Sequence, residues 1–422
     1  MGGIKPSQAT FGGGGSMIRP GLGTVLFLAV KGFRQHAFSS MVASFTIALA
    51  AGLFLSTYKI KEEANRAFAN ASGGFDAVLG ARGSKLQLIL NALFHLEASP
   101  GNLSWDHYET IKKTAGVREA FPIAVGDNYL GYRLVGTLPE LFTDHQWRPG
   151  ENYEVEKGGR IFTDSAKEAL VGSMVAQKLN LQVGDRFHPY HGLTYREESK
   201  HKDIYVVVGL LKPTGTPADR VIWIPIKGIQ MMEGHDRAMA QSVSAVLLSL
   251  KGAAGFSLDL KYNKQGDRAT LAWPVASTLG SFFNKLNWFE EILSLVASLV
   301  AFIGAMIIWS TLRTVLNERI REFAILRCLG ASRRELTFVV LSQSILMSLI
   351  GALGSLLCYF LIHKVSASLI REQTGVLMGG IVFDQTILAT FAALLLIGLL
   401  SGFLPSVQAY RVSLSENLKP KT

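Results

Sequence analysis

Cysteine is nearly absent from this sequence of 422 residues, and the two that occur are Cys328 and Cys358. Because the long stretch 59–285 contains none, we expect it to fold without disulfide bonds, and it is long enough to bury a hydrophobic core unaided. The chain also has no G-x-x-x-x-G-K-[ST] phosphate-binding loop, no H-E-x-x-H pair and no G-x-S-x-G turn. These absences predict a chain that is not an enzyme and that binds no cofactor itself.

Hydrophobic and charged residues are unevenly distributed. Hydrophobic residues make up 49% of the sequence and charged residues 18%, with a mean hydropathy of +0.27. The chain is therefore too apolar for an ordinary soluble protein and too charged to consist of membrane spans throughout. Apolar runs long enough to cross about 30 Å of hydrocarbon lie at 38–58, 292–312, 338–362 and 386–404.

The predicted fold is that of a membrane protein with four transmembrane α-helices and a large α/β extracytoplasmic domain inserted between helices 1 and 2. In chain order, the expected parts are a tag or linker (1–16), an interfacial helix with the first transmembrane helix (17–58), the inserted domain (59–285), the second transmembrane helix (286–316), a short cytoplasmic helix (317–336), the third transmembrane helix (337–363), a short extracytoplasmic loop (364–384), the fourth transmembrane helix (385–406) and a cytoplasmic tail (407–422).

Strand-like and helix-like segments alternate within the inserted domain, which predicts a mixed α/β fold. We expect two lobes, with a boundary near Gly158 and a return near Ser242. The expected strands are 74–80, 121–126, 132–136, 168–172, 204–211, 220–226 and 242–250, and the expected helices are 85–94, 106–114 and 173–180.

The net charge of +10 comes mainly from the apolar runs and their flanks. Residues 60–286 contain 26 Lys and Arg against 24 Asp and Glu, so most of the excess lies elsewhere. Lys31 and Arg34 precede the first run, six arginines lie between the second and third, and Arg411 and Lys421 follow the fourth. The positive-inside rule places both termini and the segment between the second and third runs in the cytoplasm, and the inserted domain outside. Topology explains the basic charge, so we expect no nucleic-acid partner.

The segment 317–336, NERIREFAILRCLGASRREL, is charged although it connects two apolar runs. Its apolar residues recur every three or four positions, which predicts a short amphipathic helix. Gly330 suits the left-handed residue that ends a helix, and Ser332 with Glu335 is typical of a capping box that starts the next helix. A solvated loop that only satisfies the positive-inside rule is the simpler alternative, but it requires neither the apolar stripe nor these two signals.

The stretch TVLNERIREFAILRCLGASRREL resembles the signature of FtsX-like ABC transporter permeases, in which a membrane helix runs into E-R-x-x-E-x-x-x-L-R-x-x-G-A-S. Three further pieces agree with this family: LFLAVKGFRQHAFSS, GGRIF…EALVGSMVAQKLNLQVGDRF…YVVVGLLKPTGTPADRVIWIPI and GFLPSVQAYRVSLSENLK. The resemblance is to the MacB and LolC/LolE (type VII) group and covers nearly all of the chain after Met17. It implies a protein of the bacterial cytoplasmic (inner) membrane with four transmembrane helices, a periplasmic domain with porter-like and sabre-like lobes, and permease dimers.

The resemblance also implies mechanotransmission, in which ATP and Mg²⁺ bind to a dimer of separate cytosolic ABC ATPases and the permease carries their motion outward. Hydrolysis is then expected in the other subunit. The residues assigned to coupling with the ATPase are Glu318, Arg319, Arg321, Glu322 and Arg327 as contacts, Phe323, Ile325 and Leu326 as buried area, and Gly330, Arg333 and Arg334 at the turn that follows.

The cargo stays open among a lipoprotein, a peptide, a lipid and a drug-like molecule, moved within or out of the envelope. The expected partners are the ATPase dimer, a second permease copy that is identical or not, membrane lipid, and a periplasmic adaptor or lipoprotein. One alternative function is a mechanical activator or scaffold of a periplasmic enzyme. Another is zinc-linked envelope transport that uses periplasmic histidines.

Histidines support the zinc alternative, since seven of the nine lie in the inserted domain. His188, His191 and His201 are the candidate ligands, because imidazole nitrogen is a common zinc ligand. Their segment is polar and loop-like and fits no strong metal motif, which favours surface or partner-contact histidines. We therefore assign no metal site and keep these three as candidates.

Two helical segments have alternative interpretations. The expected helix 85–94 has an apolar face that includes Leu86 and Leu90, and this face either packs in the core or meets cargo or an accessory protein. The small residues at 351–355 favour close helix contacts, either within the chain or between two copies.

Overall fold

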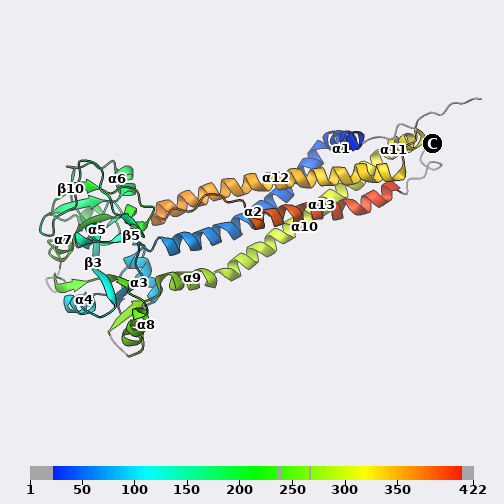
Figure 1. Cartoon of the computed structure of the whole chain (residues 1–422). Coiled ribbons are helices and arrows are strands. Elements are labelled where there is room, and N and C mark those ends of the chain that lie inside the picture. Colours follow the sequence, from blue (N-terminus) through cyan, green and yellow to red (C-terminus); the bar gives the residue numbers. More distant parts are fainter. Residues whose placement is uncertain (1–21, 236–239, 266–267, 411–422) are drawn as a thin grey trace, which may run out of the picture. The chain divides into compact units, whose positions relative to one another are not determined.

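The computed structural model describes residues 22–235, 240–265 and 268–410 (Figure 1). The described residues form two compact units. The tag or linker expected at 1–16 and residues 411–422 of the expected tail lie outside the described residues. The helical unit comprises 22–57, 292–361 and 382–410, and the α/β unit comprises the described parts of 58–291 together with 362–381.

Among the described residues, four helices are long and apolar enough to cross a membrane: α2 (Ala37–Asn70), α10 (Asn287–Glu318), α12 (Arg333–Thr374) and α13 (Gln385–Tyr410). This agrees with the four expected spans. Both α2 and α12 continue past the apolar runs that predicted them, because segments such as KIKEEANRAFAN consist largely of good helix formers. Residues 364–374 are consequently helical, where the sequence predicted part of a periplasmic loop.

Glycines bring the helices of the helical unit close together. A Cβ added at Gly304 of α10 would lie 2.9 Å from Cγ1 of Ile47, and one at Gly351 of α12 would lie 2.8 Å from Cγ2 of the same residue. Ile47 belongs to α2 and is buried in one core with Leu312 and Met347. The surface of Gly351 is therefore used within the chain, which favours the intramolecular alternative for this segment.

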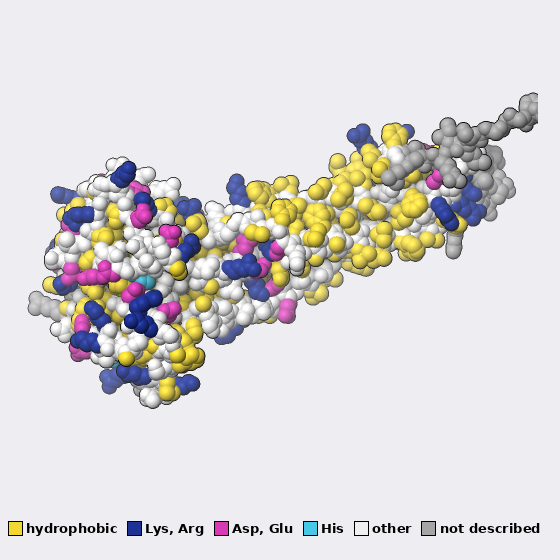
Figure 2. Space-filling view, in the orientation of Figure 1, with side chains coloured by type: hydrophobic (Ala, Val, Ile, Leu, Met, Phe, Trp, Pro, Cys, Tyr) yellow, Lys and Arg dark blue, Asp and Glu magenta, His cyan; other side chains and the backbone are white. Residues whose placement is uncertain are grey.

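Apolar side chains cover much of the visible face of the helical unit (Figure 2). In the most apolar stretch of α2, half of the residues are buried, whereas in the corresponding stretch of α10 only 17% are. On α10, Leu295, Leu299 and Phe302 are all more than half exposed. An apolar surface of this extent is suited to hydrocarbon or to a further helix rather than to water.

One ten-stranded sheet forms the frame of the α/β unit. Its strands are β1 (Ala77–Ala81), β3 (Val117–Tyr129), β4 (Tyr132–Thr137), β7 (Glu168–Val171), β8 (Arg186–Phe187), β9 (Tyr190–His191), β10 (Tyr205–Leu210), β11 (Ile222–Pro225), β13 (Ala245–Leu250) and β14 (Ala269–Ala272). The strand order is β14-β1-β13-β3-β4-β11-β7-β10-β8, and β9 pairs with β3. Two small sheets pair β2 (Leu103–Ser104) with β12 (Ser242–Val243) and β5 (Gln146–Arg148) with β6 (Glu151–Asn152).

Helices cover both faces of this sheet, because successive strand residues point to opposite sides. In β1, Ala77 and Leu79 join one buried cluster and Val78 joins the other. The mixed α/β fold is therefore confirmed. The first side is covered by α4 (Trp105–Lys112), α6 (Ser173–Leu179), α7 (Ile226–Gln230) and α8 (Ala254–Asp259), and the second by α3 (Lys85–Ala92), α5 (Glu140–Thr143) and α9 (Val275–Lys285).

The sheet runs through both expected lobes without a break near Gly158 or Ser242. The change of partner falls inside β3, which pairs with β13 through its first half and with β4 and β9 through its second. The register of β3 against β4 shifts between Val125 and Asp127. Since β4 pairs with β11, the chain has entered the second half of the sheet well before Gly158. Local patterns did not reveal this boundary because it depends on non-local strand pairing.

Helix α3 shows where the apolar face of 85–94 goes. Leu88 and Phe94 are fully buried, while Leu86 and Leu90 are partly buried against the same cluster. The face packs in the core of the domain, as the first alternative stated, and is not available to cargo.

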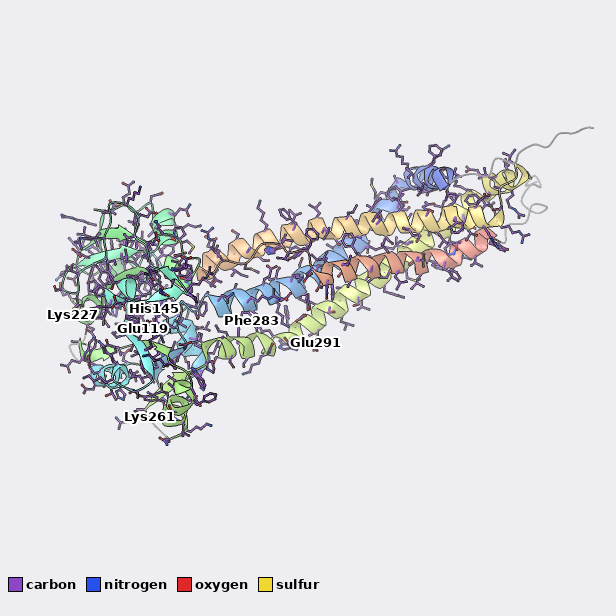
Figure 3. The ribbon with its side chains drawn as sticks, viewed as in Figure 1. Glu119, His145, Lys227, Lys261, Phe283 and Glu291 are labelled. Atoms are coloured by element: carbon purple, nitrogen blue, oxygen red, sulfur yellow. The ribbon has the colours of Figure 1, made fainter. Side chains whose placement is uncertain are left out.

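His145 has a structural role in the α/β unit, where it contacts Glu119 of β3; both residues are labelled in Figure 3. His145 is 1% exposed and stacks on Phe75, with ring centroids 4.1 Å apart. Its Nδ1 lies 2.6 Å from Oε2 of Glu119, and its Nε2 lies 2.6 Å from the carbonyl oxygen of Gly73. The imidazole thus joins the loop before β1 to the central strand, so this histidine is not a surface residue.

Candidate functional site

The connection between α10 and α12 contains a short helix, α11 (Ile320–Cys328), with a sharply defined end. Gly330 follows it with φ +106°, a conformation that favours glycine. The Ala331 N–H donates to the carbonyl of Leu326 at 2.9 Å, and the Gly330 N–H donates to the carbonyl of Arg327 at 3.1 Å. These two bonds form a Schellman motif. The predicted role of Gly330 as a helix terminator is confirmed.

Helix α12 begins with the predicted capping box. The Ser332 N–H donates to Oε2 of Glu335 at 2.6 Å, and the Glu335 N–H donates to Oγ of Ser332 at 3.3 Å. Because a terminator and an initiator follow each other directly, the hydrogen bonds of the Schellman motif and of the capping box set the direction of α11 relative to α12. The solvated-loop alternative is therefore wrong for this segment.

Arg319 and Phe323 turn inward and anchor α11. The side chain of Arg319 is 6% exposed, and its Nε donates to Oε2 of Glu322 at 2.8 Å. Its guanidinium lies 5.5 Å from the ring centroid of Phe323, which is itself buried in the core of the helical unit. A Cβ added at Gly32 would lie 3.1 Å from Nη1 of Arg319, so α1 (Leu22–Gln35) passes directly over this arginine.

The opposite face of α11 is exposed. Ile325 is 51% exposed and Leu329 is 80% exposed, and the two lie one helical turn apart. Arg321 precedes Ile325 by one turn and is also exposed. Exposed apolar side chains between charged ones are typical of a surface that binds another protein.

Helix α1 also presents apolar side chains outward. Val25 and Ala29 are buried, whereas Leu26 is 52% and Phe27 66% exposed. Lys31 lies on the same helix and is exposed. This arrangement agrees with the interfacial helix predicted before the first span.

A groove of about 670 Å³ lies between α1 and α11. Lys31 and Arg34 line one wall, and Glu322, Ile325 and Leu326 line the other. The groove joins the exposed face of α11 to the basic end of α1, so the two helices form one continuous surface.

The residues predicted to couple with a partner therefore differ in their surroundings. The prediction that Arg319 and Phe323 contribute to contact with a partner is wrong, because both side chains are buried. They hold α11 in place instead. Leu329 joins the exposed surface although the sequence pattern did not single it out. The exposed members of the predicted set are Glu318, Arg321, Glu322, Ile325, Gly330, Arg333 and Arg334, the partly buried ones are Leu326 and Arg327, and the buried ones are Arg319 and Phe323.

A second group of functional side chains lies in the α/β unit, where Asp127 faces three histidines; we call it the histidine cluster. Asp127 of β3 and His191 of β9 are directly opposite each other in an antiparallel pair. Oδ1 of Asp127 lies 3.2 Å from Nε2 of both His201 and His235 and 3.4 Å from Nδ1 of His191. Nδ1 of His191 lies 3.2 Å from Nε2 of His235. All four atoms lie within 4.8 Å of one another.

Backbone carbonyls orient two of these rings. Nδ1 of His201 lies 2.8 Å from the carbonyl oxygen of Glu233, and Nδ1 of His235 lies 2.8 Å from that of Ile229. A carbonyl only accepts, so each Nδ1 carries a proton and each Nε2 faces Asp127. Burial raises the pKa of the Asp127 carboxyl, but hydrogen bonds from the histidines outweigh burial and leave this pKa below its usual value. The same contacts raise the pKa of His201 and of His235.

Two family models match this sequence. The model described as MacB-like periplasmic core domain matches residues 22–256, which is more than half of the chain, and the model described as FtsX-like permease C-terminal matches residues 294–414. The chain is an FtsX-like ABC transporter permease of the MacB type. The α/β unit is accordingly the MacB-like periplasmic domain, and α11 lies within the FtsX-like part. Membership of this family implies a partner ATPase.

Three curated relatives are similar to the permease at modest identity. An uncharacterised ABC transporter permease of Methanocaldococcus jannaschii is 21% identical over 68% of this chain and 69% of its own length. An uncharacterised ABC transporter permease protein of Mycobacterium tuberculosis is 26% identical over 56% of this chain, and a pyoverdine export ATP-binding/permease protein of Pseudomonas syringae pv. tomato is 23% identical over 59%. The matches span only 26% and 37% of the lengths of these last two proteins.

Two solved structures are also similar to the permease. The periplasmic region of MacB from Actinobacillus actinomycetemcomitans aligns with 52% of this chain and 98% of its own, at 12% identity and a TM-score of 0.33. The extracellular domain of the noncanonic ABC-type transporter YknZ from Gram-positive bacteria aligns with 46% of this chain and 97% of its own, at 15% identity and a TM-score of 0.29.

Ion pairs join three long helices of the permease inside the α/β unit. Lys61 of α2 pairs with Glu290 of α10, and Nε2 of His363 of α12 lies 2.7 Å from Oε2 of Glu63 of α2. The side chains of Glu63 and His363 are only 12% and 7% exposed. Partly buried pairs are screened less than surface pairs, so these contacts restrain the three helices against one another.

The histidine cluster differs from the set of candidates named from the sequence. His191 and His201 belong to it, but His188 does not, because its Nδ1 lies 3.2 Å from the backbone carbonyl of His201. Asp127 and His235 were missed. They lie far from the other two in the sequence and meet them only through the pairing of β3 with β9 and the loop after α7. No local spacing signals such a set.

Proposed function

We propose that this permease binds a separate cytosolic ATPase dimer through α11 and transmits ATP-driven motion from it to the periplasmic domain. ATP and Mg²⁺ bind to the ATPase in this proposal, and hydrolysis takes place there. The absence of a phosphate-binding loop from this sequence supports that assignment.

The observation that carries the proposal is the two-sided character of α11. One side is fixed to the helical unit by Arg319 and Phe323, and the other exposes Ile325 and Leu329. A coupling element needs a surface that binds the partner and a firm attachment to the rest of the permease. The exposed side of α11 offers the first, and its buried side provides the second.

The helices on either side of α11 supply a path for the motion. Helix α12 starts at the capping box of Ser332 and continues without interruption to Thr374. Directly after this helix, Val376 is buried in a core cluster of the periplasmic domain. In this proposal, a displacement of α11 is passed to the periplasmic domain along the continuous helix α12.

The proposed orientation places both termini and α11 in the cytoplasm. Arg321, Arg333 and Arg334 are exposed around α11, as the positive-inside rule requires of a cytoplasmic segment. Cys328 of α11 is exposed and offers a direct test in a Cys358→Ser background. In spheroplasts, a membrane-impermeant maleimide should label Cys328 only after the membrane is permeabilised. A Lys200→Cys control on the periplasmic domain should react in both cases, and labelling of Cys328 in intact spheroplasts would overturn the orientation.

Cargo and further partners follow from the same proposal. We expect the permease to work as a dimer of identical or different chains, in contact with membrane lipid and with a periplasmic adaptor or lipoprotein. The cargo classes are a lipoprotein, a peptide, a lipid or a drug-like molecule. Co-purification separates this from the alternative of a mechanical activator, because an envelope hydrolase in the complex would favour activation and an adaptor would favour transport.

The decisive experiment introduces a charge on the exposed face of α11. Leu329→Glu should lower stimulation of the co-purified ATPase by at least about tenfold, since it places a carboxylate in the contact without touching the core. Val183→Glu, which changes a 46% exposed valine of the periplasmic domain, is the matched control and should leave stimulation unchanged. Full coupling in Leu329→Glu would refute the role of α11. Glu322→Arg is a poorer variant, because it also removes the hydrogen-bond partner of the buried Arg319.

A further inference from the structure

We propose that the histidine cluster is a zinc site, in which Asp127, His191, His201 and His235 bind one Zn²⁺ ion in the periplasmic domain. Three imidazole nitrogens and one carboxylate oxygen are a ligand set that Zn²⁺ accepts in tetrahedral sites. The inference rests on the geometry of these four residues alone and does not depend on the proposed coupling to an ATPase.

Four of the six separations between the ligand atoms fit a tetrahedral ion. With Zn–N and Zn–O distances of about 2.0–2.1 Å, neighbouring ligand atoms of a tetrahedron lie roughly 3.3 Å apart. Oδ1 of Asp127 lies 3.2, 3.2 and 3.4 Å from the facing nitrogens of His201, His235 and His191, and the nitrogens of His191 and His235 are 3.2 Å apart. The remaining two separations, from Nε2 of His201 to the facing nitrogens of His191 and His235, are within 4.8 Å, so the four atoms surround a space where a small cation would bind.

The tautomers of the rings point to the same conclusion. His201 and His235 each donate Nδ1–H to a backbone carbonyl, an outer contact that zinc-binding histidines commonly make. Nε2 of each ring consequently faces Oδ1 of Asp127, at 3.2 Å in both cases, on the side where a cation would bind.

Asp127 supplies an independent observation. Its side chain is fully buried, and within the described part of the chain its Oδ2 has no hydrogen-bond partner. A buried carboxylate oxygen without a partner is costly, and coordination of a cation by this carboxylate would offset that cost.

Access to the site comes from one side. The side chain of His191 is 60% exposed. His191 and His235 also line a groove of about 420 Å³, whose other walls include Gln230, Ser242 and Ser244. An ion can therefore reach the ligands from solvent. Once bound, it would tie together β3, β9, the segment before β10 and the loop after α7.

The test measures Zn²⁺ binding to the full chain, purified in detergent through a tag without histidine and stripped of metal. Calorimetric titration with ZnCl₂ should show one high-affinity site per chain, and X-ray absorption should show about four N/O ligands near 2.0–2.1 Å. His201→Gln and Asp127→Asn should each weaken binding by at least about tenfold. His188→Gln and His107→Gln are matched controls, because these histidines lie outside the cluster, and both should bind as the wild type does.

Three outcomes would overturn the site. These are no heat of binding in the wild type, binding that the cluster variants leave unchanged, and binding that His188→Gln weakens as much as His201→Gln. Misfolding of a variant does not rescue the proposal, since Co²⁺ added to the wild-type chain gives a second measurement. A tetrahedral His₃Asp site should yield intense visible absorption that added Zn²⁺ abolishes, and a weak octahedral spectrum would exclude it.

Discussion

The helix α11 and the histidine cluster both bring charged side chains together, but they arrange them in opposite ways. On α11, the anchoring residues point inward, and Ile325 and Leu329 point away from the chain into open space. In the histidine cluster, three imidazoles and one fully buried carboxylate bring their ligand atoms within 4.8 Å of one another. A divergent surface of mixed character suits a large partner, whereas convergent ligands at short separations suit a single ion. The difference shows that the direction of side chains, more than their type, indicates what a site binds.

Metal removal should have the largest effect, and only on the convergent site. With free Zn²⁺ at about 100 times Kd, binding adds roughly 2.7 kcal/mol to the stability of the periplasmic domain. Differential scanning fluorimetry of the wild type should therefore show a loss of roughly 5–10 °C in its Tm after chelation. His191→Gln should abolish this difference, whereas Leu329→Glu should keep it. An equal Tm with and without zinc would contradict the prediction.

A smaller effect is expected from filling a close contact in the helical unit. Gly304→Val places side-chain atoms against Ile47, and overpacking of this kind costs about 1–3 kcal/mol. Gly280→Ala in the periplasmic domain is the control, because no atom lies within 4 Å of the added Cβ, and it should be neutral or slightly stabilising. Unfolding in a denaturing detergent would measure both, and equal stability of the two variants would show that the helices do not need this close approach.

The next comparison is within α11 itself. Arg319→Ala removes a buried charge-assisted hydrogen bond and the packing on Phe323, so it should cost about 1.5 kcal/mol or more. Arg321→Ala changes an exposed residue and should stay within about 0.5 kcal/mol of the wild type. The same detergent unfolding assay applies. If Arg321→Ala proved the more damaging, the assignment of inward and outward faces would be wrong.

The smallest effect concerns an exposed ion pair of the periplasmic domain. The hydrogen bond from Arg160 lowers the pKa of Glu168 below its ordinary value. Stability from this pair is therefore present above the unfolded pKa of about 4.3 and is lost as the pH falls through the folded pKa. Glu168→Gln should lower the Tm slightly at pH 7 and leave it nearly unchanged in acid, so that the acid side of the Tm profile becomes flatter. A larger loss of Tm in acid than at pH 7 would contradict this sign.

Local sequence signals predicted the helical features well. The terminator at Gly330 and the capping box of Ser332 and Glu335 depend on residues within one or two turns, and the structure contains both. The four spans were also visible, because hydrocarbon thickness fixes the length of an apolar run. The apolar runs did not predict where α2 and α12 end, because residues with high helix propensity continue beyond the membrane surface.

The inward and outward faces of α11 were only partly predictable. Periodicity showed that the helix is amphipathic, but Arg319 was assigned to the surface because an arginine is usually exposed. Its burial depends on Glu322 as a hydrogen-bond partner and on α1 passing over it, and α1 is separated from it by nearly the whole periplasmic domain in sequence. Leu329 was overlooked because it lies beyond the last residue of the helix.

The sequence by itself determined the class of the protein, the four apolar spans, the inserted α/β domain and the short capped helix between two of the spans. Each of these depends on composition or on neighbours a few residues apart. The tertiary structure alone decided which side of α11 is free and which ligands meet in the histidine cluster. Both depend on strands and helices that approach from distant parts of the chain, where the side chains opposite a residue are set by pairing and packing rather than by its neighbours in sequence.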